Sequence, residues 1–395
     1  MSWRASVRGS DPAGVRVLLE LNGADLRIGA VNDALDLAEL TAPAGARYLI
    51  CGPLTPAFCE EAGRRGIDTR RVTSRSFSRR GSLAYAIDVL RWVARLSRWR
   101  PDVVHLNYSG YGPSLACAAW QCGIPVVARA GGPYIPGNLS NRWVSAYVAN
   151  CRAHADALLQ SPLRDLVTVT GDLYRPSRLR STMTLERPLA PKAAGTVRLV
   201  FLGQLVERKG VHILIDALAR TTTPCELLLA GGDWNAPGYA QRLKVMVADA
   251  GLSSRVIFEN HRADVGAVLN TADIFVLPSL SEARPRSIIE AMSLGVPVVA
   301  SDAGGIPSLI ADGDTGLLAR AGDAASLARA IDRLAAPGDL RRQIGEAGRA
   351  YVQRECRADH TANEYLAVYG RLMAQRRGAR GRSALDNTGV STWPT

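Results

Sequence analysis

Residues 197–220 read VRLVFLGQLVERKGVHILIDALAR, which is an apolar run, a glycine-containing loop and a helical pattern in direct succession. The run VRLVFL does not alternate with polar residues, and such runs are typical of strands that are covered on both faces. Apolar residues at helical spacing follow Gly210. This order predicts one repeat of a parallel α/β sheet.

The same alternation of apolar runs and helical stretches extends through both halves of the chain. The other runs are VRVLLEL (15–21), RYLIC (47–51), DVVHL (102–106), IPVVARA (124–130), ELLLAGG (226–232), RVIFE (255–259), DIFVLP (273–278) and VPVVAS (296–301). The pattern predicts two doubly wound, Rossmann-like α/β domains. A ligand is expected at the C-terminal strand edges, in a deep cleft between the two domains.

The predicted domain limits follow from the linker LERPLAPKAAGT (185–196), which is rich in proline and small residues. The prediction is a first domain over 1–190 and a second over 191–355. A C-terminal helix over 356–374 could cross back to the first domain. Residues 375–395 have little apolar periodicity and predict a disordered basic tail.

The composition excludes several classes of protein. Apolar residues make up 47% and charged residues 21%, which is ordinary for a globular protein. The seven cysteines include no CxxC pair, so neither a disulfide framework nor a zinc site is indicated. There is no apolar run long enough for a membrane span and no signal-peptide pattern, which predicts a cytoplasmic protein.

The net charge of +12 is unevenly distributed, and only three basic residues are lysines: Lys192, Lys209 and Lys244. Residues 1–195 hold 25 basic and 15 acidic residues, a net +10. Nucleic acid would suit that charge, but no zinc-finger, helix-turn-helix or aromatic-basic sheet motif accompanies it. The charge alone therefore does not predict a specific nucleic-acid partner.

The loop after the first strand of the second half, Gly203 to Gly210, is the first candidate site. Glycine permits a tight strand exit, and the helix that follows presents free N–H groups that suit a phosphate. Lys209 lies at the mouth of this loop in a chain with very few lysines. A capped helix with solvated charges remains the alternative interpretation.

The second candidate is PSLSEARPRSIIEAM (278–292), which also follows an apolar run. Pro285 suits the first turn of a helix, and Glu290 falls one turn deeper. Glu282 precedes Glu290 by a seven-residue gap. A carboxylate accepts two hydrogen bonds, which suits a vicinal diol such as a ribose. An ordinary glutamate near a helix N-terminus is the alternative.

Together the two segments resemble the retaining GT-B glycosyltransferases of family 4. That family has a Gly-Arg-Leu…Lys-Gly loop, later a Glu-x7-Glu element ending in Glu-Ala-Met, and then Gly-x-Pro-Val-Val. Here Gly203 and Lys209 match the loop, Glu282 and Glu290 have the spacing, and Gly-Val-Pro-Val-Val follows at 295–299. The matching extends through AGGIP (303–307), DGDTG (312–316) and RVIF (255–258).

The first half resembles the family less closely. Ile28-Gly29-Ala30 stands where members have Gly-Gly-Ala, and Asp36-Leu37-Ala38 follows at the same spacing. Many members have a histidine after the fourth strand, whereas this chain reads ARAGG at 128–132. Arg129 and Gly131 are therefore the candidates for the acceptor side, with a structural role for Arg129 as the alternative.

The resemblance implies transfer of a sugar from a UDP- or GDP-sugar, with retention and with neither a cofactor nor a metal. It implies Glu282 and Lys209 as catalytic residues: Lys209 faces the diphosphate and Glu282 the sugar hydroxyls. The donor-binding residues that it implies are Gly29, Gly203, Gln204, Lys209, Arg262, Arg286, Ser287, Ile288 and Glu290. Within this set Glu290 would hold the ribose, and the His261-Arg262 loop would frame the base. Gln204 stands where the family usually has Arg, and Ala283 stands where it has Gly.

The helical stretch 82–100 predicts how the first domain meets its acceptor. Leu83, Ala86, Ile87, Leu90, Val93 and Ala94 form one side, and Asp88, Arg91, Arg95 and Arg98 form the opposite stripe, bordered by Tyr85, Trp92 and Trp99. A basic stripe with aromatic borders suits an anionic membrane interface that presents a lipid-linked acceptor. The prediction is a peripheral protein on the inner face of the cytoplasmic membrane. An ordinary surface helix packed on the sheet is the alternative.

The family pattern leaves three functions open. The first is transfer to a glycan or lipid-linked acceptor in cell-surface polysaccharide or glycolipid synthesis. The second is a nucleotide-sugar 2-epimerase of the same shape. The third is a catalytically weak partner subunit, which the glutamine at 204 would suit.

Overall fold

The computed structural model describes residues 14–23, 26, 29–72, 83–107, 112–130, 142–171, 173–175, 179, 182–234 and 236–386. It divides the chain into two compact units. Unit 1 comprises Met1–Leu173 and Ala358–Thr395, and unit 2 comprises Tyr174–Arg357. The first boundary therefore lies at Leu173, whereas the sequence predicted a first domain that ends at residue 190. The predicted cleft concerns the placement of the two units and stays a prediction.

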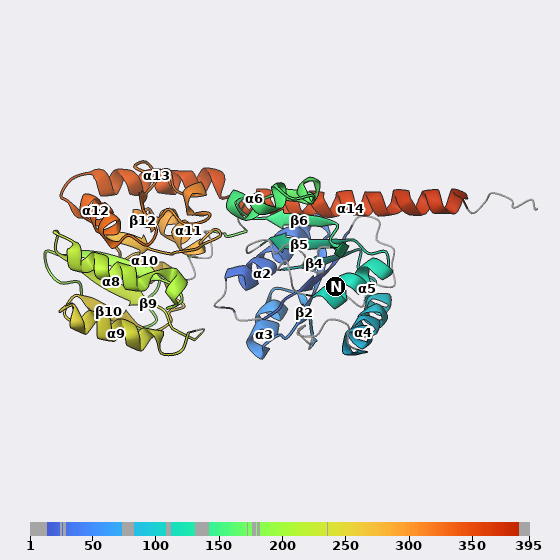
Figure 1. The fold of residues 1–395 in the computed structure, drawn as a ribbon, viewed down its shortest axis with the longest axis horizontal. Helices are drawn as coiled ribbons and strands as arrows, with labels where there is room; N and C mark the ends of the chain where they lie inside the picture. Colours follow the sequence, from blue (N-terminus) through green and yellow to red (C-terminus); the bar gives the residue numbers. More distant parts are fainter. Residues whose placement is uncertain are drawn as a thin grey trace, which may run out of the picture. The chain divides into compact units, whose positions relative to one another are not determined.

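Unit 1 contains a seven-stranded sheet of order β3-β2-β1-β4-β5-β6-β7 in which every pair is parallel (Figure 1). Its strands are β1 (Arg16–Glu20), β2 (Arg47–Gly52), β3 (Asp68–Arg71), β4 (Val103–Leu106), β5 (Val126–Ala130), β6 (Ala146–Ala149) and β7 (Val167–Val169). The apolar runs predicted as buried strands are buried: Val17, Leu18 and Leu19 on β1 have no exposed surface. A strand covered on both faces cannot alternate polar and apolar residues.

Helices cover both faces of this sheet. They are α2 (Gly29–Thr41), α3 (Pro56–Arg64), α4 (Leu83–Trp99), α5 (Pro113–Gln121), α6 (Arg152–Leu159) and α14 (Ala358–Asp386). The core on one face contains residues of α2, α3 and α14, and the core on the other contains residues of α4, α5 and α6. Local signals fix some of the helix starts: Thr55 accepts a hydrogen bond from Phe58 N at 3.2 Å, and Pro56 occupies the first turn of α3.

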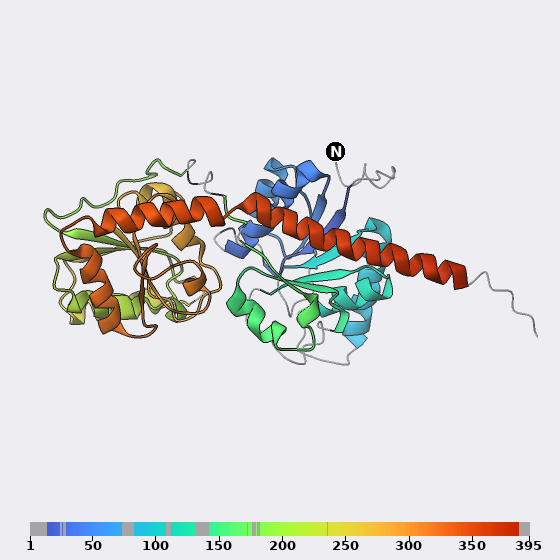
Figure 2. The ribbon, with the colours of Figure 1, turned by 90° about the horizontal axis from the view of Figure 1, so that it is seen from above.

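Helix α14 belongs to unit 1 and runs along the α2 side of its sheet (Figure 2). Tyr365 and Tyr369 on α14 are buried, and the Tyr369 hydroxyl lies 2.7 Å from Nδ1 of His105 on β4. Burial, helped by the charge of Arg129, lowers the pKa of His105 to about 3. The imidazole is therefore neutral and serves to anchor α14 on unit 1.

The C-terminal tail is shorter than the sequence predicted. Helix α14 extends to Asp386, so the prediction of disorder is wrong for residues 375–386, and residues 387–395 lie outside the described part of the chain. The reason is that glutamine, arginine and alanine are good helix formers, so helix geometry continues where the apolar periodicity ends. The absence of an apolar face does not by itself end a helix.

The orientation of α4 is the reverse of the prediction. Val89, Trp92 and Leu96 are buried, whereas Leu83 and Leu90 are exposed. Asp88, predicted on the outer stripe, is also buried and accepts a hydrogen bond from Ser114 Oγ of α5 at 2.6 Å. Trp92 offers more apolar area than the leucines on the other side, and Ser114 satisfies the carboxylate that is buried with it. Of the predicted stripe, Asp88 is therefore buried and Arg95 half-buried, whereas Arg91 and Arg98 are exposed.

Unit 2 contains a six-stranded parallel sheet of order β10-β9-β8-β11-β12-β13. Its strands are β8 (Val197–Leu202), β9 (Cys225–Ala230), β10 (Val256–Glu259), β11 (Ile274–Leu277), β12 (Val298–Ser301) and β13 (Leu317–Ala319). Its helices are α8 (Val211–Arg220), α9 (Tyr239–Asp249), α10 (Val265–Leu269), α11 (Arg286–Ser293), α12 (Ala324–Ala335) and α13 (Leu340–Glu355). Two doubly wound, Rossmann-like units confirm the predicted fold class. Within the described residues, no helix has the length and apolarity that crossing a membrane needs.

The strand order of unit 2 locates its ligand site. The chain runs outward from β8 through β9 to β10 and then returns to place β11 on the other side of β8. Ligands of open α/β sheets bind beyond the carboxyl ends of the strands where this reversal occurs. The loops after β8 and β11 are therefore expected to hold the ligand, and they are the two segments that the sequence singled out.

Candidate functional site

The loops that follow β8 and β11 are in direct contact. Leu280 N donates to Arg208 O at 2.7 Å. Gly210 has a φ of 66°, and a Cβ at that position would lie 2.0 Å from Pro278 O. Only glycine therefore allows the first loop to pass so close to the second. This contact brings together residues that are about 70 positions apart in the chain.

Lys209 and Glu282 form the ion pair at the centre of this contact. The Lys209 ammonium contacts Glu282 Oε1, and Ser279 Oγ donates to the same oxygen at 2.9 Å. Arg208 Nη1 lies 3.9 Å from that oxygen. Lys209 and Glu282 expose only 13% and 9% of their side chains, so water screens their charges weakly. Two cations beside one carboxylate leave a net positive charge at the loop.

The N-terminus of α11 faces the ligand side of β11 without a side-chain cap. Pro285 is the N-cap residue and supplies no hydrogen bond from its side chain. Ile288 N donates to Pro285 O at 3.2 Å, and Ser287 lies in the first turn of α11, where an α-helix offers its N–H groups no partner of its own. Uncapped first-turn amides and the helix dipole favour an anion at this position. The guanidinium of Arg286 stands over the Tyr174 ring, 5.6 Å from its centre.

Glu290 lies one turn deeper in α11 and is half-buried. Within the described residues its carboxylate makes no hydrogen bond or ion pair, although the charge of Arg286 acts on it. Burial raises the pKa of Glu290, and Arg286 opposes that shift. A half-buried carboxylate without a donor is costly unless a ligand supplies hydroxyl or N–H groups. Glu290 is thus the residue of this site that most clearly needs a ligand.

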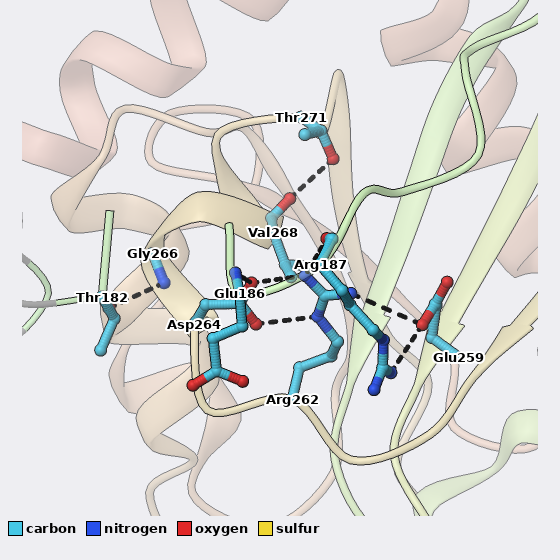
Figure 3. Close-up of polar contacts among 9 residues, drawn as sticks. All are labelled: Thr182, Glu186, Arg187, Glu259, Arg262, Asp264, Gly266, Val268 and Thr271. Carbon is cyan, nitrogen blue, oxygen red and sulfur yellow. Dashed lines mark hydrogen bonds and ion pairs between the residues drawn. The ribbon is translucent and has the colours of Figure 1, made fainter. Parts of the chain in front are cut away.

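Arg262 is buried in an ion-pair network (Figure 3), whereas the family resemblance implied that it binds the donor. Its guanidinium, 1% exposed, is bonded to Asp264 through Nε at 2.8 Å and again through Nη2. Nη2 also donates to Arg187 O at 2.9 Å, and Asp264 accepts from Glu186 N at 2.8 Å. This network ties the segment before β8 to the loop after β10. The sequence motif places Arg262 in the correct loop but cannot show which way its side chain turns.

Trp234 is a site residue that the sequence reasoning missed. It follows β9, and its ring meets the exposed His261 after β10 edge to face, with centroids 5.7 Å apart. A Cβ on Gly232 would lie 2.6 Å from the Trp234 ring, so the indole rests against a bare backbone. An aromatic pair beyond the ends of adjacent strands offers a stacking surface for a planar ligand group. The signal in the sequence was a tryptophan two residues after the Gly-Gly pair that follows β9.

The remaining predicted residues are divided between the two units, and one of them, Arg129, forms an ion pair within unit 1. Gly203 and Gln204 lie in the β8 loop, where Gln204 is half-buried. Gly29 begins α2 in unit 1, and Gly131 lies outside the described residues. Arg129 is buried, and its Nη2 donates to Asp33 Oδ2 of α2 at 2.6 Å. Its predicted role on the acceptor side is therefore corrected to a structural ion pair beneath α2.

A buried carboxylate occupies the corresponding reversal point of unit 1. Glu20 ends β1 beside β4 and is buried, and a Cβ on Gly112 would lie 2.1 Å from its Oε2. Burial, with a smaller contribution from Asp88, raises the pKa of Glu20 from 4.5 to about 7. The carboxyl group therefore changes charge near neutral pH.

We expect Glu20→Gln to remove a pH dependence of stability. An acid whose pKa rises on folding stabilises the folded state below its unfolded pKa, and this contribution is lost as the pH rises through the folded pKa. The free energy of unfolding of the wild type should thus fall by about 3 kcal/mol between about pH 5 and about pH 8 because of this group. Denaturant unfolding at both pH values measures the change, with the exposed Glu60→Gln as the control. An unaltered pH dependence in Glu20→Gln would contradict the assignment.

Among the described residues, no group of three or more His, Cys, Asp or Glu side chains could hold a metal ion. The prediction that the reaction needs no metal is a matter of mechanism and stays a prediction.

Comparison with known proteins links the two units to one family. Residues 186–351 match the family model described as "Glycosyl transferases group 1", and residues 29–197 match "Glycosyl transferase 4-like domain". The lipopolysaccharide core biosynthesis glycosyltransferase LpsE of Rhizobium meliloti is 33% identical over 42% of this chain and 48% of its own length. The D-inositol 3-phosphate glycosyltransferase of Stackebrandtia nassauensis is 26% identical over 76% of this chain and 75% of its own length. The first curated relatives, such as LpsE, are thus matched over about half of their length.

Solved structures show the same fold. A glycosyltransferase from Rickettsia africae superposes with a TM-score of 0.78 at 18% identity and covers 91% of this chain and 99% of its own. Anabaena HepE, solved in complex with UDP and glucose, gives a TM-score of 0.72 at 24% identity and covers 89% of this chain and 98% of its own. At these identities the likeness concerns the fold.

Proposed function

The chain belongs to the group 1 glycosyltransferases of the GT-B fold, and from this premise we propose that it transfers a sugar from a nucleotide-diphosphate sugar to a glycan or lipid-linked acceptor. The observation that carries the proposal is the meeting of Lys209 and Glu282 at the strand reversal of unit 2, beside the uncapped α11 and the unpartnered Glu290. A diphosphate, a ribose diol and a sugar are the groups that such a site accommodates. The HepE complexes with UDP and UDP-glucose support UDP as the first nucleotide to test.

Each group of the donor has a matching residue. Glu290 accepts hydrogen bonds from the two ribose hydroxyls. Lys209 and the first-turn amide of Ser287 bind the diphosphate, since amides at a helix start and a compact cation both favour phosphate. The amide of Ile288, predicted for the same role, already donates to Pro285 O. Glu282 orients the sugar hydroxyls. Trp234 and His261 provide the surface on which the base stacks.

The chemical step depends on charge that grows on the leaving group. The bond between the anomeric carbon and the phosphate oxygen breaks, and the acceptor oxygen forms the new bond on the same face. The acceptor proton passes to the departing phosphate, which gives retention without a protein nucleophile. Lys209 and the α11 amides stabilise the growing negative charge, and one such donor contributes about 3–4 kcal/mol. Fixed cations at this position are what makes a metal unnecessary in this proposal.

Gln204 removes one charge that the family usually places beside the phosphates. Arg208 compensates in this proposal, since its guanidinium already lies 3.9 Å from Glu282 and more than half of its side chain is exposed. An exposed arginine can turn toward a diphosphate when one binds. This keeps the enzyme active and disfavours the weak-subunit alternative.

The acceptor in this proposal is a glycan or a lipid-linked molecule. LpsE acts in lipopolysaccharide core biosynthesis, as its name states, and this supports a glycan or lipid-linked acceptor for the present chain. A lipid-linked acceptor places the enzyme at the surface of a membrane, on its cytoplasmic side. Incubation with the nucleotide sugar alone separates transfer from 2-epimerisation, because an epimerase needs no acceptor.

We expect Glu290→Gln to weaken donor binding about 10- to 100-fold. The substitution replaces a charged acceptor of two hydroxyl hydrogen bonds by a neutral amide with one acceptor oxygen, and hydrogen bonds to charged groups contribute about 1.5–3 kcal/mol. Thermal shift across a panel of UDP- and GDP-sugars measures the affinity and also identifies the nucleotide. Glu346→Gln, which replaces an exposed glutamate on α13, is the matched control. Equal affinity of Glu290→Gln and the wild type would remove Glu290 from the ribose site.

A further inference from the structure

Helix α4 of unit 1 has an exposed apolar strip. Leu83 is 78%, Ile87 39% and Leu90 66% exposed, and the exposed Ala94 continues the series. These residues follow one another at spacings of four, three and four, which places them on one side of a helix. We call Leu83, Ile87, Leu90 and Ala94 the α4 strip.

The α4 strip is not needed to hold the helix on its own domain. Val89, Trp92 and Leu96 already fill the inner side, and Trp92 meets Trp99 edge to face with centroids 6.4 Å apart. At about 100° per residue, Trp92 lies opposite Leu83 on the helix. The inner face therefore packs completely without the strip, and the strip is surplus apolar surface.

Positive charge lies directly beside this surface. Arg91 and Arg98 are exposed and follow Ile87 and Ala94 by one turn, so they border one edge of the α4 strip. Helix α5 lies beside α4 (Figure 1), and its Trp120 is 63% exposed. Exposed leucines with an arginine border and a neighbouring tryptophan are the composition of a helix that lies in a membrane interface. The strip contains no carboxylate, and its border carries two arginines. This charge favours anionic over neutral lipid.

We propose that the α4 strip docks unit 1 on an anionic lipid surface, with Leu83, Ile87 and Leu90 entering the interface and Arg91 and Arg98 binding the headgroups. The biological role of this docking rests on the proposed function, because it brings the enzyme to a lipid-linked acceptor. The docking face is the side of α4 opposite Trp92. It shares Arg91 and Arg98 with the stripe that the sequence indicated, but leaves out Asp88 and Arg95 and adds the exposed leucines.

Vesicle co-sedimentation of the full chain tests the docking. The wild type is expected to bind vesicles of phosphatidylglycerol and phosphatidylcholine, and not vesicles of phosphatidylcholine alone. The variant Leu83→Glu/Leu90→Glu should lower the partition coefficient at least about tenfold, since two leucines leave the interface. The control Val245→Glu replaces another exposed apolar residue, on α9 of unit 2, and should bind as the wild type does.

The role of Arg91 and Arg98, which border the α4 strip, is tested separately. Arg91→Gln/Arg98→Gln should lower binding to the anionic vesicles several-fold and weaken its salt dependence. Arg220→Gln/Arg329→Gln, two exposed arginines of unit 2, is the matched control. All four variants change exposed residues, and circular dichroism checks that each folds.

Several results would overturn the proposal. They are unchanged binding by the double-glutamate variant, equal binding of the wild type to neutral vesicles, and no binding to either vesicle. Light scattering coupled to gel filtration adds one more: a wild-type dimer that Leu83→Glu/Leu90→Glu dissociates would show that a second copy covers the strip. The donor-dependent thermal shift is measured on the same samples. If the wild type binds the vesicles but none of the nucleotide sugars, the proposed function is wrong and the docking surface is still supported.

Discussion

Lys209→Ala is expected to lower kcat for sugar transfer about 100- to 1000-fold, the cost of removing one fixed donor to a charge that develops in the transition state. Lys209 is held at the strand reversal by its ion pair with Glu282, and only 13% of its side chain is exposed. Its charge therefore acts through a poorly screened environment and needs little reorganisation when the diphosphate departs. Steady-state kinetics with the nucleotide sugar identified by thermal shift measure the effect.

Two further variants show whether the position of the charge matters. Lys244→Ala removes one of the other two lysines, an exposed residue on α9, and should leave kcat unchanged. Lys209→Arg keeps the charge but in a wider, planar group, and should recover only part of the rate. If Lys209→Ala retained kcat within about threefold of the wild type, the proposed role of Lys209 in leaving-group stabilisation would be wrong. An intact thermal transition in the absence of donor ensures that a loss reflects chemistry.

Asp264→Ala should destabilise unit 2 by about 3 kcal/mol, the lower end of the range for removing one partner of a buried ion pair. It leaves the guanidinium of Arg262 buried with only Glu259, 3.6 Å from Nη1, and the carbonyl of Arg187 as partners. It also removes the acceptor of Glu186 N. Because Asp264 is charged only above its pKa, which the hydrogen bond from Arg262 lowers, the pair stabilises the fold at neutral pH and weakens in strong acid.

The double variant Arg262→Met/Asp264→Leu distinguishes a structural from a ligand-binding role. It removes both charges together, and apolar replacement of a buried pair is often neutral. Calorimetry should therefore show most of the lost stability restored, and the affinity for donor per folded molecule should equal that of the wild type. Restored stability with lost donor affinity would instead return Arg262 to the nucleotide site.

The fold class and the two loops of the site could be predicted from the sequence because both depend on local signals. Continuous apolar runs specify strands that are covered on both faces, and helical patterns between them specify parallel connections. Glycine at 210 and proline at 285 mark where a strand exit and a helix start lie. That Lys209 and Glu282 come together was decided by the sheet order, which places β11 beside β8.

Trp234 could not be assigned from such signals. The residue type alone does not distinguish a tryptophan of a core from one of a binding surface, and its partner His261 follows the next strand, β10. The contact requires the pairing of β9 with β10, which no single segment of sequence contains. The aromatic surface is therefore a product of the sheet order.

The sequence by itself determined two Rossmann-like units, the family motif and the two loops that carry Lys209 and Glu282. Only the tertiary structure decided how individual side chains are used. Arg129 pairs with Asp33, and Arg262 pairs with Asp264. On α4, the choice between burying Trp92 and burying Leu90 was made by Ser114 and the core of the neighbouring helix. The physical reason is that periodicity defines the faces of a helix, whereas burial and charge pairing depend on which atoms of distant segments lie opposite each face.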